Sequence, residues 1–136
     1  MPTPGTLHHV ELYVADLQRS LSFWRWFLLR LGYSEYQSWE EGCSFRLGDT
    51  YLVFVQVAEH HRKFEYHRCH PGLNHLAFHA KSRAEVDQLT IELQQRGIEI
   101  LYPECHPNAG GEGYYAVFFE DPDRMKVEFV APDITE

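Results

Sequence analysis

The chain repeats one strand–helix pattern, and each copy has a histidine at the same step. His9 precedes Asp16 by seven positions, and His75 precedes Ser82 by seven positions. In both copies a helical run follows and ends at a glycine. Such a repeat predicts two similar modules, and an approximate twofold axis between them would bring the two histidines together. Two imidazoles and one carboxylate would then form a metal site.

The flanking residues show which of two adjacent histidines is the repeated one. The segment Leu7-His8-His9 aligns with Leu73-Asn74-His75, so His9 and not His8 corresponds to His75. Both histidines lie in segments that alternate between apolar and polar residues, as in a strand with one buried face.

The order of predicted elements is β-α-β-β-β in each half. Asp16 and Ser82 are suitable N-cap residues for the two helices, which are expected to end at Gly32 and Gly97. We therefore expect an α+β fold in which two βαβββ modules, about 7–57 and 73–131, form a curved mixed-sheet cup within a single domain 1–136, joined by a connector 58–72. The expected strands are 7–14, 33–39, 43–47, 51–57, 73–80, 98–102, 114–119 and 126–130.

The charge and composition of the chain argue against some classes of partner. The formal net charge of -8 argues against nucleic acid and against an anionic membrane surface. The first residues have neither the basic start nor the apolar segment of a signal peptide. Three cysteines without close pairing indicate a reducing compartment, so we expect a cytoplasmic protein. Four histidines in the connector lie at irregular spacings and are interpreted as solvent-exposed side chains: His60, His61, His67 and His70.

Three groups of residues give the chain a family resemblance. They are the run from His9 to Asp16 with Leu31-Gly32-Tyr33, the run from Gly72 to Phe78, and the run from Asp121 to Glu128. In order and spacing they resemble the vicinal oxygen chelate superfamily, which includes glyoxalases, bleomycin-resistance proteins and dioxygenases. The resemblance covers about residues 7–131, and it implies a metal-dependent enzyme with His9, His75 and Glu128 as ligands. It also implies a homodimer.

A fourth ligand position is open to question. When the segment Tyr51 to Val55 is set against Met125 to Phe129, Phe54 falls opposite Glu128 and cannot bind a metal. Gln56 is two residues further on the same face, so its amide oxygen is a possible ligand, as in methylmalonyl-CoA epimerase. The alternative is a polar residue at the end of a strand. The absence of a second carboxylate here argues against typical glyoxalase I chemistry.

The expected metal is a divalent ion, because two imidazoles and a carboxylate suit Zn²⁺, Ni²⁺, Co²⁺, Mn²⁺ and Fe²⁺. Open coordination positions would let a small substrate chelate the ion, which would polarise a carbonyl or stabilise an enolate. Lyase or isomerase chemistry is the leading hypothesis. Glu11, on the face of His9, and His79, on the face of His75, are the candidate general bases. The alternative for both is polarity at the rim of the sheet.

Two other functions remain possible from the sequence. One is a small extradiol-type dioxygenase with Fe²⁺. The other is a bleomycin-resistance-like dimer that sequesters a planar cationic ligand between aromatic side chains, for which the sequence offers Trp24, Trp26, Trp39, Tyr114 and Tyr115. The aromatic surplus of the first helix, which includes Phe23 and Phe27, indicates either unusual burial or contact with a second chain. The loop 103–113 is expected to be either a lid or a long hairpin connection.

Overall fold

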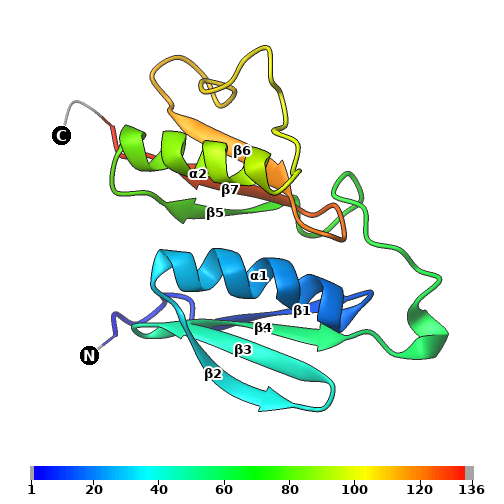
Figure 1. Ribbon diagram of the computed structural model, residues 1–136. Coiled ribbons are helices and arrows are strands. Elements are labelled where there is room, and N and C mark those ends of the chain that lie inside the picture. Colours follow the sequence, from blue (N-terminus) through cyan, green and yellow to red (C-terminus); the bar gives the residue numbers. More distant parts are fainter. Residues whose placement is uncertain (1, 134–136) are drawn as a thin grey trace. The chain divides into compact units, whose positions relative to one another are not determined.

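The computed structural model describes residues 2–133 and divides the chain into two compact units, Met1–Glu65 and Tyr66–Glu136 (Figure 1). The division lies inside the segment that the sequence indicated as a connector. One short 3-10 turn, Glu59–His61, occurs in this segment. Among the described residues, neither helix has the length and apolar character needed to cross a membrane.

The first unit has the predicted β-α-β-β-β order. Its elements are β1 (His9–Val14), α1 (Leu17–Leu31), β2 (Ser34–Trp39), β3 (Gly42–Leu47) and β4 (Thr50–Gln56). The sheet order is β1-β4-β3-β2, in which β1 and β4 are parallel and the other pairs are antiparallel. The strand that begins the module is therefore at an edge of the sheet.

The caps of α1 follow the sequence prediction. The Asp16 carboxylate accepts a hydrogen bond from the Arg19 backbone N–H at 3.2 Å, which satisfies one of the free donors of the first turn. Gly32 ends the helix with a φ of 104°, a left-handed conformation that side chains with a Cβ disfavour.

The second unit repeats this plan with one strand fewer. Its elements are β5 (His75–His79), α2 (Arg83–Gln95), β6 (Ala116–Glu120) and β7 (Lys126–Val130). The sheet order is β5-β7-β6, with β5 and β7 parallel and β6 and β7 antiparallel. The Ser82 hydroxyl accepts from the Glu85 backbone N–H at 3.2 Å and starts α2, as the capping-box pattern predicted.

The prediction of a strand at 98–102 is wrong. Only Ile100 makes an isolated bridge, with Phe119 of β6. The chain then turns away, since Tyr102 adopts a φ of 54° that is incompatible with an extended strand. The strand expected at 114–119 also begins later, at Ala116, so that Tyr114 belongs to the loop.

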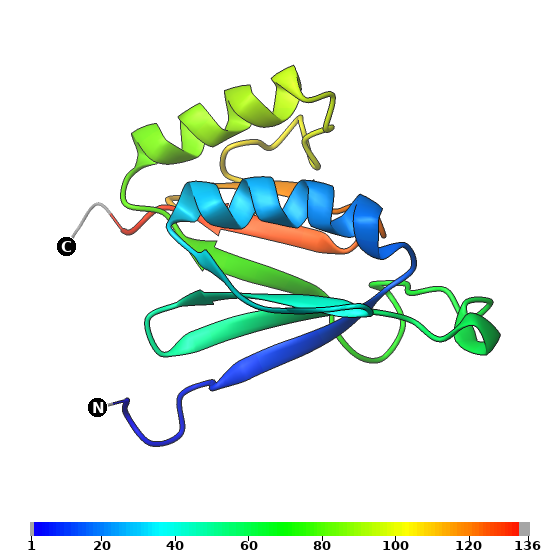
Figure 2. The same ribbon diagram turned by 60° about the horizontal axis from the view of Figure 1, so that its bottom comes forward.

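Each helix runs along one face of its own sheet, as the two ribbon views show (Figures 1 and 2). In the first unit the Trp24 indole of α1 stacks on Phe54 of β4 with ring centroids 5.0 Å apart. In the second unit the corresponding core contains Leu89 and Leu93 of α2 with Phe129 of β7, all fully buried. Because side chains alternate between the two faces of a strand, the residues between these core positions lie on the face of each sheet that is not packed on its helix.

The aromatic residues of α1 belong to the core. Trp24 and Phe27 are completely buried, Phe23 is 6% exposed, and Trp26 is half-buried. Their rings form one cluster with centroid separations of 5.2 to 6.4 Å. Of the two explanations for this aromatic surplus, burial is the one observed, so the helix gives no support to a dimer.

The same unit contains a buried thiol. Cys43 of β3 is 1% exposed, and its Sγ donates to Glu35 Oε1 at 3.4 Å. Glu35 also accepts from Arg25 Nη2 at 2.9 Å. Burial, and then the neighbouring Glu35 carboxylate, raise the pKa of the Cys43 thiol to about 11. The thiol is therefore protonated at neutral pH.

Candidate metal centre

A histidine and a buried carboxylate face each other in the second unit. His75 Nε2 lies 3.1 Å from Glu128 Oε1, and Glu128 is only 3% exposed. The parallel register pairs His75 with Lys126 and Ala77 with Glu128, so these side chains share one face of the sheet. This face is opposite to the face that packs on α2.

The other nitrogen of His75 is held by the preceding residue. His75 Nδ1 donates to Asn74 Oδ1 at 2.7 Å, and Asn74 Nδ2 donates to the Arg68 carbonyl at 3.4 Å, which fixes the orientation of the amide. In this tautomer the neutral ring presents an unprotonated Nε2 to a carboxylate oxygen. Two acceptors at hydrogen-bond distance need a cation between or beside them, either a proton or a metal ion.

Tyr114 holds the second oxygen of the carboxylate. Its phenol O–H donates to Glu128 Oε2 in a short hydrogen bond. This bond, followed by burial, raises the pKa of Tyr114 from its usual value of 10.0 to about 12. Tyr114 is consequently a hydrogen-bond donor at neutral pH, and the other oxygen of Glu128, Oε1, is the one that faces His75.

The loop before β6 places Tyr114. A Cβ added to Gly110 would lie 2.2 Å from the Tyr114 ring, so only glycine allows the ring to lie against the backbone there. The Asn108 amide donates to the Tyr114 carbonyl at 3.3 Å, and the Ala116 N–H donates to the Pro107 carbonyl at 2.9 Å. The loop is thus an ordered segment that presents one phenol to the sheet.

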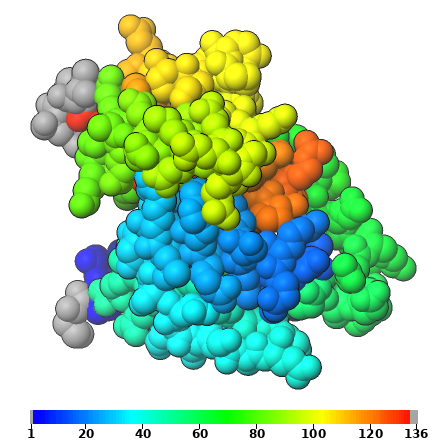
Figure 3. Space-filling view, in the orientation of Figure 1, coloured from blue at the N-terminus to red at the C-terminus, as the bar shows by residue number. Residues whose placement is uncertain are grey.

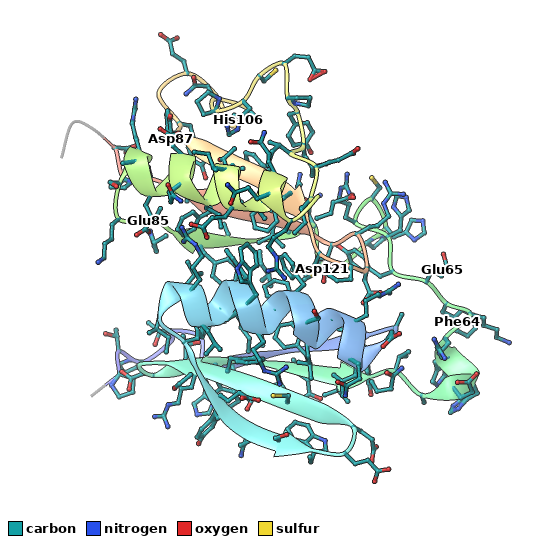
Figure 4. The ribbon with its side chains drawn as sticks, viewed as in Figure 1. Phe64, Glu65, Glu85, Asp87, His106 and Asp121 are labelled. Atoms are coloured by element: carbon teal, nitrogen blue, oxygen red, sulfur yellow. The ribbon has the colours of Figure 1, made fainter. Side chains whose placement is uncertain are left out.

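The same loop packs on α2. The Tyr115 hydroxyl donates to Asp87 Oδ1 at 2.5 Å, and the Arg83 guanidinium lies over the Tyr115 ring, 4.8 Å from its centroid. Figure 4 shows Asp87 of α2 and His106 of the loop on the same side of the second unit. Burial lowers the pKa of His106. In the space-filling view, α2 and this loop form adjoining parts of the surface of the second unit (Figure 3).

The turn that leads into β7 fixes the position of the carboxylate along the strand. Asp121, labelled in Figure 4, accepts from the backbone N–H groups of Asp123 and Met125 at 2.9 and 2.8 Å. Arg124 adopts a φ of 66° within this turn. The sequence indicated a turn at these residues, and its side-chain hydrogen bonds start β7 two residues before Glu128.

The first unit has a matching histidine in a different setting. His9 Nδ1 lies 2.9 Å from His8 Nδ1, so the preceding residue again contacts the Nδ1 of the repeated histidine. The His9 ring stacks on Tyr51 with centroids 4.7 Å apart and an angle of 3° between the planes. His9 is exposed, and Nε2 is the nitrogen that this arrangement leaves for a metal ion.

The predicted register of the fourth ligand position is wrong by one residue. In the structure His9 pairs with Tyr51 and Glu11 with Val53, whereas His75 pairs with Lys126 and Ala77 with Glu128. When the two units are matched at their histidines, Val53 takes the place of Glu128 and Phe54 the place of Phe129. A shift of one residue moves a side chain to the opposite face of a sheet.

Gln56 accordingly lies on the helix side of its sheet, in line with Phe54. Its Oε1 accepts from the Leu17 backbone N–H at 2.8 Å, and its Nε2 donates to the Ala15 carbonyl at 2.8 Å. Both ends of the amide therefore contact the segment that starts α1. Gln56 has a capping role there, and this placement contradicts the idea that it faces the metal site.

The two candidate general bases lie on the predicted faces of their strands. Glu11 is two residues from His9 on β1, and His79 is four residues from His75 on β5; both side chains are exposed. At about 3.3 Å per residue, Glu11 is about 7 Å along the strand from its histidine and His79 about 13 Å. Of the two, Glu11 is nearer to an atom bound at its own histidine.

The donor set fits a divalent metal ion. An imidazole with a supported Nδ1, together with a buried carboxylate held by a phenol, is a common environment for metal ligands and the groups that orient them. Within residues 2–133, no three His, Cys, Asp or Glu side chains are gathered closely enough to hold an ion. A catalytic centre with three protein ligands needs one more beyond the His75–Glu128 pair. The four connector histidines are exposed, as expected.

Sequence comparison gives the family. The model of the Glyoxalase/Bleomycin resistance protein/Dioxygenase superfamily matches residues 6–129, and the chain belongs to this superfamily. The uncharacterized protein YqjT of Bacillus subtilis (strain 168) is 58% identical over 126 residues, which cover 93% of this chain and 98% of YqjT. The fold is thus the glyoxalase-like α+β fold that the resemblance implied, built from the two modules that the repeat predicted.

Solved structures agree with this assignment. The crystal structure of a candidate glyoxalase from Bacillus halodurans has a TM-score of 0.93 and 56% identity, and the match covers 95% of this chain and 97% of the other. The fosfomycin resistance protein FosX from Listeria monocytogenes, complexed with Mn(II) and a sulfate ion, has a TM-score of 0.67 and 19% identity, with 98% of each chain covered. The similarity to FosX shows the shared fold alone.

Proposed function

We propose that this protein is a metal-dependent enzyme of the superfamily that acts on a small, oxygen-chelating molecule by lyase or isomerase chemistry. The observation that supports this function is the His75–Glu128 pair. Asn74 binds Nδ1 of the histidine and Tyr114 binds Oε2 of the carboxylate, so that His75 Nε2 and Glu128 Oε1 face each other. His9 is the proposed third ligand. Zn²⁺, Ni²⁺, Co²⁺, Mn²⁺ and Fe²⁺ all suit two imidazoles and one carboxylate.

A divalent ion bound there would act as a Lewis acid that polarises a substrate oxygen. The chain's own groups would do the rest. Glu11 is the first choice of proton acceptor because of its shorter distance along the strand, and His79 is the second. Tyr114 remains protonated, so it orients Glu128 and does not accept a proton from substrate.

The dimer is also a proposal. Each proposed ligand histidine lies on a strand at an edge of its own sheet, β1 or β5, whose outer backbone groups have no partner strand in that sheet. Pairing of modules would cover such edges. Light scattering should therefore give the mass of two chains. Mixing His9→Ala and Glu128→Ala proteins would restore part of the metal binding if each site is formed by two chains, and would restore none if it is formed by one.

Metal titration followed by calorimetry tests the function. Purified protein stripped with a chelator should bind about one Mn²⁺ or Zn²⁺ per chain, and His75→Ala should lose most of this affinity. His70→Ala is the matched control, since His70 is exposed in the same unit and lies outside the sheet. Wild-type protein that binds no divalent ion, or His75→Ala protein that binds like wild type, would contradict the proposal.

The bleomycin-resistance-like alternative loses part of its basis in the structure. Trp24 is fully buried in the core, Tyr115 donates to Asp87, and Tyr114 donates to Glu128. Three of the five aromatic side chains that were expected to contact a planar ligand thus have other contacts. The metal-dependent enzyme is for this reason the function we put forward.

A further inference from the structure

Lys126 lies beside the His75–Glu128 pair and on the same face of the sheet. The β5–β7 register pairs it directly with His75, and Glu128 is two residues further along β7. Side chains two residues apart on a strand are separated by about 6.5 to 7 Å. The ammonium group is thus within the span of a small molecule that also reaches the pair.

The groups that this ammonium contacts are neutral. Lys126 Nζ donates to Tyr102 Oη at 3.1 Å and lies 5.5 Å from the Tyr102 ring centroid and 5.8 Å from that of Phe118. Tyr102 holds this position with a positive φ of 54°, which is uncommon for a residue with a large side chain. Such contacts orient a cation without neutralising its charge.

The nearest candidate for an ion pair has other partners. Glu120 is opposite Lys126 in the β6–β7 register, but its carboxylate contacts Arg68 and also lies 3.4 Å from Arg124 Nε. In the described part of the chain, Lys126 has no carboxylate within ion-pair distance. A protein with a net charge of -8 therefore keeps this one ammonium unpaired next to its metal-binding residues.

We propose that Lys126, oriented by Tyr102, is an anion-binding subsite, and that the substrate has a phosphonate, phosphate or carboxylate group near the oxygens that reach the metal. This inference rests on the metal site proposed above. It adds to the proposed function that the substrate is negatively charged. An ammonium is a compact charge that suits a small oxyanion. An adjacent metal ion would add to the same attraction.

The test uses the full-length protein and three simple probes. Mn²⁺ affinity is measured first by calorimetry. The Mn²⁺-loaded protein is then titrated with inorganic phosphate, methylphosphonate and acetate, while the electron paramagnetic resonance spectrum of Mn²⁺ is followed. We expect one of these anions to bind to the wild type, and its affinity to fall at least about tenfold in Lys126→Met, as expected for the loss of one charge-assisted contact.

Three variants make the result specific. Lys126→Arg should keep most of the anion affinity, and Tyr102→Phe should weaken it several-fold because the ammonium loses its Oη partner. Lys63→Met is the matched control, because Lys63 also lies over an aromatic ring, 5.3 Å from the Phe64 centroid, but in the first unit and outside any sheet. It should bind the anion like the wild type.

The outcomes separate the two proposals. If the wild type binds no metal, the metal-site proposal fails, and the inference that rests on it fails too. If Mn²⁺ binds but none of the three anions does, or if Lys126→Met binds the anion as well as wild type, the subsite alone is wrong. A weaker Mn²⁺ affinity in Lys126→Met would also overturn the proposal, since removal of a positive charge cannot weaken cation binding through electrostatics.

Discussion

The two units share a backbone plan and a helix-packed face, yet the opposite faces of their sheets differ. Matched at His9 and His75, the position of Glu128 in the second unit is held by Val53 in the first, and the position of Lys126 by Tyr51. Val53 is 4% exposed and Glu128 is 3% exposed, so the positions are equally buried. One fold thus accommodates either an apolar side chain or a carboxylate at this position, provided that the carboxylate has partners such as Tyr114 and His75.

Substitutions on the helix-packed faces of the two sheets should destabilise the protein to a similar extent, and this destabilisation is the largest effect we expect. Phe54 and Phe129 occupy matching positions and are both fully buried. Truncation of either, in Phe54→Ala or Phe129→Ala, should lower the free energy of unfolding by about 3 to 5 kcal/mol, because each leaves a cavity in a packed core. Urea unfolding followed by circular dichroism measures this. A loss below about 1 kcal/mol for one of them would show that the two cores are not equivalent.

The faces of the two sheets that are not packed on a helix should respond differently to substitution. Glu128→Gln should weaken Mn²⁺ or Zn²⁺ binding by at least about 100-fold, since loss of groups that only support a ligand already costs about 10- to 100-fold. That factor corresponds to about 2.7 kcal/mol. Val53→Ala, at the matching position, should leave metal affinity unchanged. Equal metal affinities for Glu128→Gln and wild type, measured by calorimetry, would exclude Glu128 as a ligand.

The residues that precede the two histidines sharpen the comparison. Asn74 and His8 both contact Nδ1 of the histidine that follows, at 2.7 and 2.9 Å. Asn74→Ala should reduce metal affinity by about tenfold, because His75 loses the partner that fixes its tautomer and ring orientation. His8→Ala should have a similar effect if His9 is the third ligand. An effect of Asn74→Ala alone would restrict the metal centre to the second unit.

Tyr114→Phe should give the smallest change in stability, about 1 kcal/mol, from loss of the bond to Glu128. The raised pKa of Tyr114 means that the folded state favours the protonated phenol. Its contribution is therefore fully present below pH 10 and is lost as the pH rises through about 12. The free energy of unfolding, measured between pH 10 and about 12, should fall more steeply with pH for wild type than for Tyr114→Phe. Tyr13→Phe, at an exposed site of the first unit, should not change that slope.

Sequence reasoning reached the fold through residues whose role is local. Asp16, Ser82 and Gly32 mark helix ends by hydrogen bonding and by conformation, so their meaning is readable without the rest of the chain. Alternating apolar residues together with turn residues predicted segments that overlap each strand of the described chain. The missing strand at 98–102 shows the limit. Tyr102 adopts a positive φ there, and its hydroxyl accepts from Lys126, 24 residues away; no local pattern marks either feature.

The site was predictable only in part, for a similar reason. His75 and Glu128 were expected as metal ligands, and the structure brings their side chains together. Gln56 was misplaced because two apolar strands can be aligned in several registers, and a shift of one residue changes the face. The role of Tyr114 was missed, since no pattern links a loop residue to a carboxylate 14 positions later. The glycine at position 110, against which its ring packs, was the only available signal.

The buried thiol of Cys43 makes the first unit open to kinetic observation. Cys69 and Cys105 are exposed, whereas Cys43 is enclosed and has a pKa of about 11. Thiol reagents attack the thiolate, so in the native protein they should modify the two exposed cysteines of the second unit and leave Cys43 intact. In a Cys69→Ser, Cys105→Ser background, the rate at which Cys43 is labelled would then report how often β3 opens. The reactivity of this one side chain would thus measure the rate of local unfolding in the first unit.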